Sequence, residues 1–315
     1  MTKHSSIKDG TPAGSLLERA TNIYDFGAAL RGSAAPKIDV PADMPVVMPP
    51  PVAAPQDGMA ADAPESVTPA LGPWPGPAEA IDRGALIEAG FVLPDGPVSG
   101  ISEEFRILKR ELLDQLRGGK TANGGQLLVC SAHSGEGKTF CAVNLALSLA
   151  AEQDVEVLLV DADFANPSVL SALGLPGGPG LMDVLADPSL AVEDCVIRTD
   201  IPSLAVLPAG RQTNNDTEYL ASARTQRLLA SLTQGRSNRI VIFDSPPLLA
   251  ASPAAALAGH ADMALLVVRA DRTSENALRD AASLLKGCGS VRLILNGITF
   301  SASGRRFGNY YGGGM

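Results

Sequence analysis

A glycine-rich turn between an apolar run and a helical pattern constrains the fold more than any other feature of this chain. Residues 126–130 form the apolar run, and the helical pattern covers residues 140–151. Between them stands Ser131-Ala-His-Ser-Gly-Glu-Gly-Lys-Thr139. In a strand–turn–helix unit of this kind, backbone N–H groups and the helix dipole converge on one spot and favour anionic oxygens. The sequence therefore predicts a phosphate-binding loop.

The residues of this loop predict how a nucleotide is held. Lys138 is placed to reach the β- and γ-phosphates, and the Thr139 hydroxyl to bind Mg²⁺. Ala132 stands where the usual loop has its first glycine, and we expect His133 to face solvent. The residues expected to contact the nucleotide are Ser134, Gly135, Glu136, Gly137, Lys138, Thr139 and Phe140.

Carboxylates follow two other predicted strands. Asp161 and Asp163 come just after the apolar run 157–160, and alternation along a strand points them the same way. Asp244 ends the run 240–243. A lone aspartate at a strand end more often caps a helix, but three of them beside a phosphate loop favour a Mg²⁺ site.

Phosphoryl transfer needs charge neutralisation and a group that orients or deprotonates the acceptor. We assign neutralisation to Lys138 and to Mg²⁺ held by Thr139, Asp163 and Asp244. The remaining carboxylate, Asp161, is assigned to the acceptor. The division of roles between Asp161 and Asp163 stays open.

Short apolar runs alternate with helical patterns along the rest of the chain. Continuous apolar strands between helices predict an α/β fold with a doubly wound, mostly parallel sheet, whose ligands bind at the carboxyl ends of the strands. A helix is expected to start after Ser102, with that residue as its N-cap. The other segments are strands at 126–130, 155–160, 204–207, 239–243, 263–268 and 291–295, and helices at 140–152, 219–233 and 273–287.

The amino-terminal third has a different composition. Residues 33–80 hold twelve of the 24 prolines and few charges, so they cannot bury enough apolar surface to fold. Before them, residues 14–31 have the spacing of an amphipathic helix, which docks either on a partner or on its own domain. We expect four parts: an N-terminal segment (1–32), a disordered linker (33–97), the nucleotide-binding domain (98–304) and a flexible tail (305–315).

Charge and cysteine usage limit the partners. The net charge is −9, and no dense basic block appears, which argues against nucleic acid as a partner. The four cysteines lack metal-binding or C-x-x-C spacing, which is typical of a reduced, cytoplasmic protein. The opening residues 1–10 are polar, unlike a signal peptide, and no long apolar run predicts a membrane span.

Taken together, three motifs resemble those of a known family. GEGKT (135–139), VLLVDAD (157–163) and VIFDSPP (241–247) are similar to the Walker A, A′ and B motifs of bacterial tyrosine autokinases, which have a P-loop NTPase fold and act in capsule and exopolysaccharide synthesis. SEEFRILKR (102–110) is similar to the family's E-x-x-R-x-x-[KR] helix, and the tyrosine pair near the C-terminus to its tyrosine-rich tail. SLLERA (15–20) and the proline-rich linker look most like the exosortase-associated branch.

The resemblance implies an ATP-dependent kinase that phosphorylates Tyr310 and Tyr311 in trans, within a homo-oligomeric ring. It implies activation by a membrane chain-length regulator of the polysaccharide co-polymerase type, which would hold the cytoplasmic enzyme at the inner face of the membrane. Glycines on both sides of the tyrosine pair favour a tail loose enough to enter another subunit. The implied ring-interface residues are Glu104, Arg106, Lys109 and Arg110.

Two alternatives stay open. Ala165 stands where the family's A′ motif usually has arginine, and the tail has only two tyrosines, so a nucleotide-binding scaffold that docks to a membrane partner is one alternative. The other is a ParA-like or MinD-like ATPase switch. That class carries a signature lysine where this chain has His133, which argues against the switch.

Overall fold

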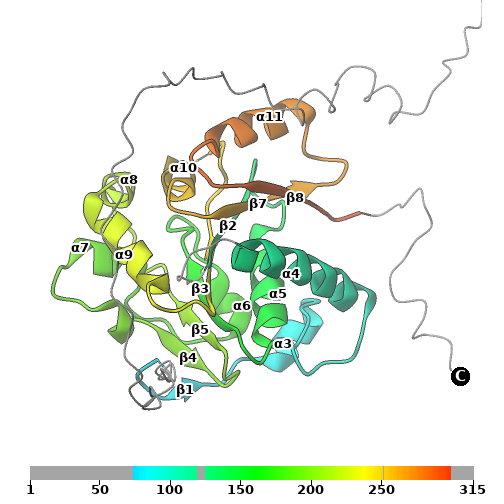
Figure 1. The fold of residues 1–315 in the computed structure, drawn as a ribbon, viewed down its shortest axis with the longest axis horizontal. Helices are drawn as coiled ribbons and strands as arrows, with labels where there is room; N and C mark the ends of the chain where they lie inside the picture. Colours follow the sequence, from blue (N-terminus) through cyan, green and yellow to red (C-terminus); the bar gives the residue numbers. More distant parts are fainter. Residues whose placement is uncertain (1–73, 119–124, 251, 299–315) are drawn as a thin grey trace, which may run out of the picture. The chain divides into compact units, whose positions relative to one another are not determined.

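A computed structural model describes residues 74–118, 125–250 and 252–298 (Figure 1). Its centre is an eight-stranded sheet with the order β1-β4-β5-β3-β6-β2-β7-β8. Among the described strands, only the β4–β5 pair is antiparallel. The strands are β1 (Ala78–Glu79), β2 (Gly125–Ser131), β3 (Glu156–Asp161), β4 (Ile197–Thr199), β5 (Leu204–Leu207), β6 (Arg239–Asp244), β7 (Met263–Arg269) and β8 (Val291–Asn296).

The six strands expected from the sequence are confirmed, each to within one residue at either end. Their continuous apolar runs arise because both faces of β2, β3, β5 and β6 are buried. The sequence did not predict β1 and β4, which have two and three residues and are too short to show a pattern.

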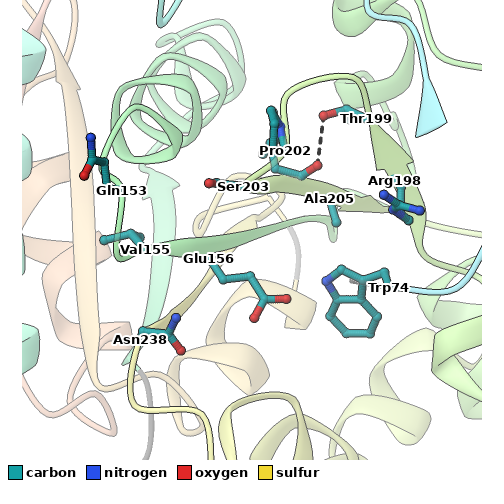
Figure 2. Close-up of a pocket in the computed structure, with 11 residues that line it drawn as sticks. Trp74, Gln153, Val155, Glu156, Arg198, Thr199, Pro202, Ser203, Ala205 and Asn238 are labelled. Atoms are coloured by element: carbon teal, nitrogen blue, oxygen red, sulfur yellow. Dashed lines mark hydrogen bonds between the residues drawn. The ribbon is translucent and has the colours of Figure 1, made fainter. Parts of the chain in front are cut away.

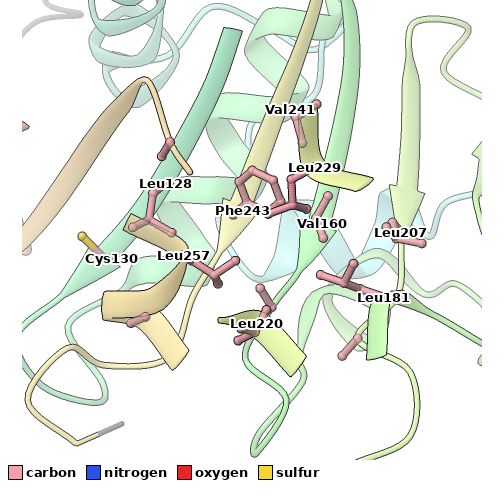
Figure 3. Close-up of a cluster of buried hydrophobic side chains, with 14 of the residues drawn as sticks. Leu128, Cys130, Val160, Leu181, Leu207, Leu220, Leu229, Val241, Phe243 and Leu257 are labelled. Carbon is pink, nitrogen blue, oxygen red and sulfur yellow. The ribbon is translucent and has the colours of Figure 1, made fainter. Parts of the chain in front are cut away.

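Helices cover both faces of the sheet, so the doubly wound prediction is confirmed. Alternate side chains of β2 enter different cores: Leu127 and Val129 face one, and Leu128 and Cys130 the other. Figure 3 shows the second core, where Phe243 lies among leucines from the covering helices. The first face is covered by α3 (Arg83–Glu88), α4 (Gly100–Gly118), α5 (Lys138–Ala150) and α6 (Val169–Leu173), and the second by α7 (Leu181–Ala186), α8 (Asp216–Leu220), α9 (Ala223–Thr233), α10 (Ser252–Ala258) and α11 (Glu275–Leu284).

Helix boundaries differ from the prediction where capping side chains set them. α4 begins at Gly100, and the Ser99 hydroxyl accepts a hydrogen bond from the Ser102 N–H at 3.2 Å, so Ser102 is not the cap. The expected helix 219–233 is two helices, because Ser222 caps α9 by accepting from the Thr225 N–H. None of the described helices combines the length and apolar character needed to span a membrane.

Residues 74–97 belong to the folded domain, so the predicted linker boundary at 97 is wrong. Leu86 of α3 is fully buried, the Val92 N–H donates to the Asn144 side chain at 2.8 Å, and Arg83 pairs with Asp200. Too few apolar residues here form a periodic pattern, and Trp74, Ile81 and Leu86 are buried by elements distant in the sequence. The predicted helix 14–31, the rest of the linker and the tail lie outside the described residues.

Trp74 packs at the amino end of β3 and β6. The Arg239 guanidinium lies 4.2 Å from the centre of its ring and donates to Glu156 at 2.8 Å. Figure 2 shows the indole beside Glu156, at one wall of a cavity of about 210 Å³. A guanidinium stacked on an indole is a favourable cation–π contact, more so when water is excluded.

We expect Trp74→Ala to lower the free energy of unfolding by about 3 kcal/mol, because a buried indole and its stacking partner are lost. Urea denaturation followed by circular dichroism measures this, with Trp74→Phe as the variant that keeps a ring. An unchanged urea midpoint for Trp74→Ala would contradict the packing of Trp74 on the folded domain.

Candidate active site

Three neighbouring strands bring the predicted site together. β6 lies between β3 and β2, with Asp161 opposite Asp244 in one pair and Val129 opposite Asp244 in the other. The phosphate loop therefore leaves β2 next to the two strands that end in carboxylates. The sequence could place each motif at a strand end, but the strand order decides that they meet.

Backbone conformation explains the glycines of the loop. Gly137 has φ 96° and forms the N-cap of α5, while Gly135 has φ 75°. A Cβ on Gly137 would lie 2.1 Å from the Asn296 side-chain nitrogen. Both positions disfavour any residue with a side chain, and the loop delivers the free N–H groups of the first turn of α5 to one spot.

Two side chains from distant elements hold the loop in place. The Asn296 amide at the end of β8 donates to the Glu136 carbonyl at 2.9 Å. The buried Glu136 carboxylate accepts from the Thr273 hydroxyl and, at 2.9 Å, from the His133 N–H. Glu136 thus shapes the loop from within, and the His133 side chain is exposed, as expected. No sequence pattern pointed to Thr273.

Asp244 and Thr139 form the centre of the site. The Thr139 hydroxyl donates to Asp244 Oδ2 at 2.6 Å, and Asp244 is fully buried. Its other oxygen, Oδ1, has no hydrogen-bond partner among the described residues. Burial raises the pKa of this carboxyl to about 7, although the Thr139 hydrogen bond and the Lys138 charge oppose the rise. A buried oxygen without a partner beside a hydroxyl fits a bound cation.

Asp161 uses its carboxylate differently from the prediction. One oxygen accepts from the Ser168 and Val169 N–H groups at 2.9 and 3.0 Å, and the other from the Asp163 N–H at 3.2 Å. Asp161 therefore fixes the start of α6 and the loop that follows β3. Ser168, which the sequence did not single out, also lies 3.1 Å from the Thr139 hydroxyl.

Asp163 is the carboxylate that stays available beside Lys138. Burial raises its pKa, and the nearby Lys138 charge partly opposes the rise. Lys138 is itself buried, with 6% of its surface exposed. The lysine and Asp163 therefore share a weakly solvated space, where charge interactions are stronger than in water.

A nucleotide with Mg²⁺ fits these donors. The described residues contain no cluster of three or more histidine, cysteine or acidic side chains that could hold a metal alone. Mg²⁺ needs only one or two carboxylates and a hydroxyl when phosphates and water complete its shell. The ring of Phe140, a residue expected to contact the nucleotide, is half-buried and packs 5.1 Å from the ring of Phe91.

The predicted ring-interface residues on α4 divide into two groups. Glu104 and Arg110 are exposed, and Arg106 is half-buried and pairs with Glu103. Lys109 is buried, and its ammonium donates to the Ser148 carbonyl at 3.0 Å and pairs with Glu152 at 2.6 Å. Lys109 therefore joins α4 to α5 within one chain, and the ring-interface assignment of these residues stays a prediction.

Comparisons with known proteins place this chain in a family. A family model described as an AAA domain matches residues 127–296. Tyrosine-protein kinase YwqD of Bacillus subtilis is 32% identical over 73% of this chain and 94% of its own length. The chain belongs to the bacterial tyrosine kinases.

Other relatives support this family. Putative tyrosine-protein kinase EpsB of Ralstonia solanacearum is 30% identical over 59% of this chain, which spans only 25% of EpsB. The solved kinase domain of VpsO is 33% identical, with a TM-score of 0.51, over 63% of this chain and 98% of that domain. Kinase relatives at this identity make the ParA-like alternative the weaker one.

We expect Asp244→Asn to gain stability relative to the native protein as pH rises from 4 to 7. The native carboxyl keeps its proton in this window while the unfolded one loses it, so its contribution to stability falls as pH rises through its folded pKa of about 7. The relative gain is on the order of 4 kcal/mol at most. Urea unfolding at several pH values, without nucleotide or Mg²⁺, measures it.

The control is Asp183→Asn. Although Asp183 is partly desolvated, its hydrogen bond with Arg211 and backbone N–H groups lower the pKa of its carboxyl below the usual 3.8, so this variant should lose relative stability as pH rises toward 4 and change little from pH 4 to 7. A difference between Asp244→Asn and the native protein that does not change with pH contradicts the assignment.

Proposed function

We propose that this chain uses ATP to phosphorylate Tyr310 and Tyr311 of a neighbouring copy of itself. The observation that carries the proposal is the meeting of Lys138 and Thr139 with Asp163 and Asp244 on adjacent strands. The tail tyrosines lie outside the described residues, so their role rests on the sequence and on the family.

The phosphate loop binds and orients the nucleotide. N–H groups at the start of α5 and the Lys138 ammonium hold the phosphate oxygens, and burial of Lys138 strengthens that attraction. When bound, Mg²⁺ neutralises phosphate charge during transfer. Thr139 Oγ1 and Asp244 Oδ1 are the atoms that would hold it.

Asp163 is the better candidate to receive the proton of the tyrosine hydroxyl. As the phenolic oxygen forms its bond to the γ-phosphorus and ADP leaves, that proton passes to the Asp163 carboxylate. Because burial raises the pKa of Asp163, the difference between this pKa and the phenol's ordinary pKa of about 10 is smaller, which makes the proton transfer less unfavourable. Asp161, with three backbone hydrogen bonds, positions the loop that carries Asp163.

Assembly and regulation follow from the family resemblance. Exposed Glu104 and Arg110 and half-buried Arg106 remain available for a contact between copies in a ring. A membrane regulator of the polysaccharide co-polymerase type would recruit the ring to the inner face of the membrane and couple phosphorylation to exopolysaccharide export. Membership of the exosortase-associated branch stays a prediction.

With Mg²⁺ and ATP, the purified full chain should acquire phosphate on Tyr310 or Tyr311. Lys138→Met should abolish labelling without unfolding the protein, because one phosphate-binding charge is lost. Lys286→Met, at an exposed position, is the matched control. Mass spectrometry of the C-terminal peptide measures the result.

A mixing experiment separates transfer in trans from transfer in cis. Lys138→Met chains with an intact tail are combined with active chains carrying Tyr310→Phe and Tyr311→Phe. Phosphate should appear on the Lys138→Met chain. No phosphate there, while native chains label themselves, would contradict transfer between copies, and an unlabelled native tail would favour the scaffold.

The two aspartates of the A′ motif should respond differently to the same change. Asp163→Asn should lower the labelling rate about 100-fold or more, because the proton acceptor is lost, with little effect on stability. Asp161→Asn should lower the free energy of unfolding by about 1–3 kcal/mol, because an amide NH₂ would face backbone N–H groups. Equal stability of the two variants would reject this division.

A further inference from the structure

An apolar groove runs between α4 and the carboxyl end of β8. Figure 1 shows the two elements side by side, and Gln115 of α4 accepts a hydrogen bond from Arg292 of β8 at 2.9 Å. The groove has a volume of about 300 Å³. Its walls include Ile107, Leu295 and Ile298, which are 39%, 55% and 54% exposed. None of the described residues fills it.

Two carboxylates accompany this apolar surface. Glu104 and Glu111 also line the groove, and both are exposed. They lie seven residues apart, two turns on one side of a helix. Neither forms an ion pair with a described residue. The groove therefore suits an apolar side chain flanked by positive charge.

The groove also adjoins the phosphate loop. Phe140, in the first turn of α5, and Asn296, which donates to the Glu136 carbonyl, both line it. An occupant would therefore pack against Asn296, which supports the loop, and against Phe140, which follows it. Occupancy of the groove and nucleotide binding at the loop would therefore involve neighbouring residues.

We infer that the groove is a docking site for this chain's own segment Arg305-Arg306-Phe307. The chain leaves the described structure at Ile298, a residue of the groove wall, and seventeen residues follow it. They contain two adjacent arginines, an aromatic residue directly after them, and no Asp or Glu. Phe307 fills the groove, and the two guanidinium groups face Glu104 and Glu111.

Reach and size favour this occupant over others. Phe307 is nine residues from Ile298, and an extended chain of that length covers up to about 30 Å, which is ample for a return to the groove. A cavity of about 300 Å³ holds one aromatic side chain, not a helix. The N-terminal segment 14–31 would offer a helical face of balanced charge, which matches neither the volume nor the carboxylates.

The consequence is a contact that restrains the kinase. This restraint rests on the proposed function, in which Tyr310 and Tyr311 are the acceptors. The two tyrosines follow Phe307 by three and four residues, so docking of Phe307 holds them near α4 of their own chain. A docked tail is then withheld from the active site of another copy. Release of the tail precedes phosphorylation in trans.

Disulfide trapping tests the docking without any need for activity. Leu295→Cys and Gly308→Cys, a pair that keeps Phe307, are combined in a Cys288→Ser background, in which the remaining native cysteines are buried. Mild oxidation of a mixture of ¹⁴N- and ¹⁵N-labelled full-length chains should give a linked peptide pair of a single isotope. Leu284→Cys with Gly308→Cys is the control, since Leu284 is also exposed, on α11.

Each outcome has a meaning. A mixed-isotope link places the tail of a second copy in the groove and overturns docking in cis. No link, or equal linking of the Leu284→Cys control, overturns the docking itself. A single-isotope link in a chain whose tail is never phosphorylated supports docking and rejects the proposed function instead.

A charge exchange tests the restraint on activity. Glu111→Arg should raise the initial rate of tail labelling about two- to fivefold, the range expected when one exposed ion pair is lost. Adding Arg306→Glu to that variant should restore the native rate. Glu88→Arg, an exposed reversal at the end of α3, should leave the rate unchanged. A native rate for Glu111→Arg, or no restoration by the second change, overturns the restraint.

Discussion

The hydrogen bond from Thr139 to the buried carboxylate of Asp244 is the interaction on which the site depends. It joins the first turn of α5 to the end of β6, and the other Asp244 oxygen has no partner in the part of the chain that the structure describes. A carboxylate in that position costs stability in the empty protein, because burial disfavours its charge. A cation bound beside Asp244 would remove this cost, which is why the proposed Mg²⁺ site accounts for a buried carboxylate here.

The strands β3 and β6, whose carboxyl ends carry Asp161 and Asp244, are also joined by side chains at their amino ends. β3 and β6 pair from Glu156 and Arg239 at the amino edge to Asp161 and Asp244 at the carboxyl edge. A buried ion pair is weak evidence for stability by itself, because desolvation offsets the attraction. Here Arg239 also stacks on Trp74, so the ion pair is part of the contact that attaches the start of the described chain to the sheet.

Helix α4 contacts α5 on one side and lines the groove beside β8 on another. Lys109 is held by α5, while Glu104 and Glu111 line the groove beside β8. Glu104 therefore belongs to both the proposed ring interface and the proposed tail site. If both proposals hold, docking of the tail and assembly of the ring compete for this residue, which would link the release of the acceptor tyrosines to assembly.

The sequence by itself determined six of the eight described strands, the phosphate loop and the family, because these depend on local patterns: continuous apolar runs, a glycine-rich turn before a helix, and carboxylates that follow apolar runs. Only the tertiary structure decided which partners those side chains have. It filled both Asp161 oxygens with backbone N–H groups, turned Lys109 inward, and buried Trp74 and Leu86 in a segment whose composition predicts disorder. The physical reason is that hydrogen-bond partners and burial come from residues distant in the chain. Local patterns in a single sequence do not show which distant residues lie close together in the fold.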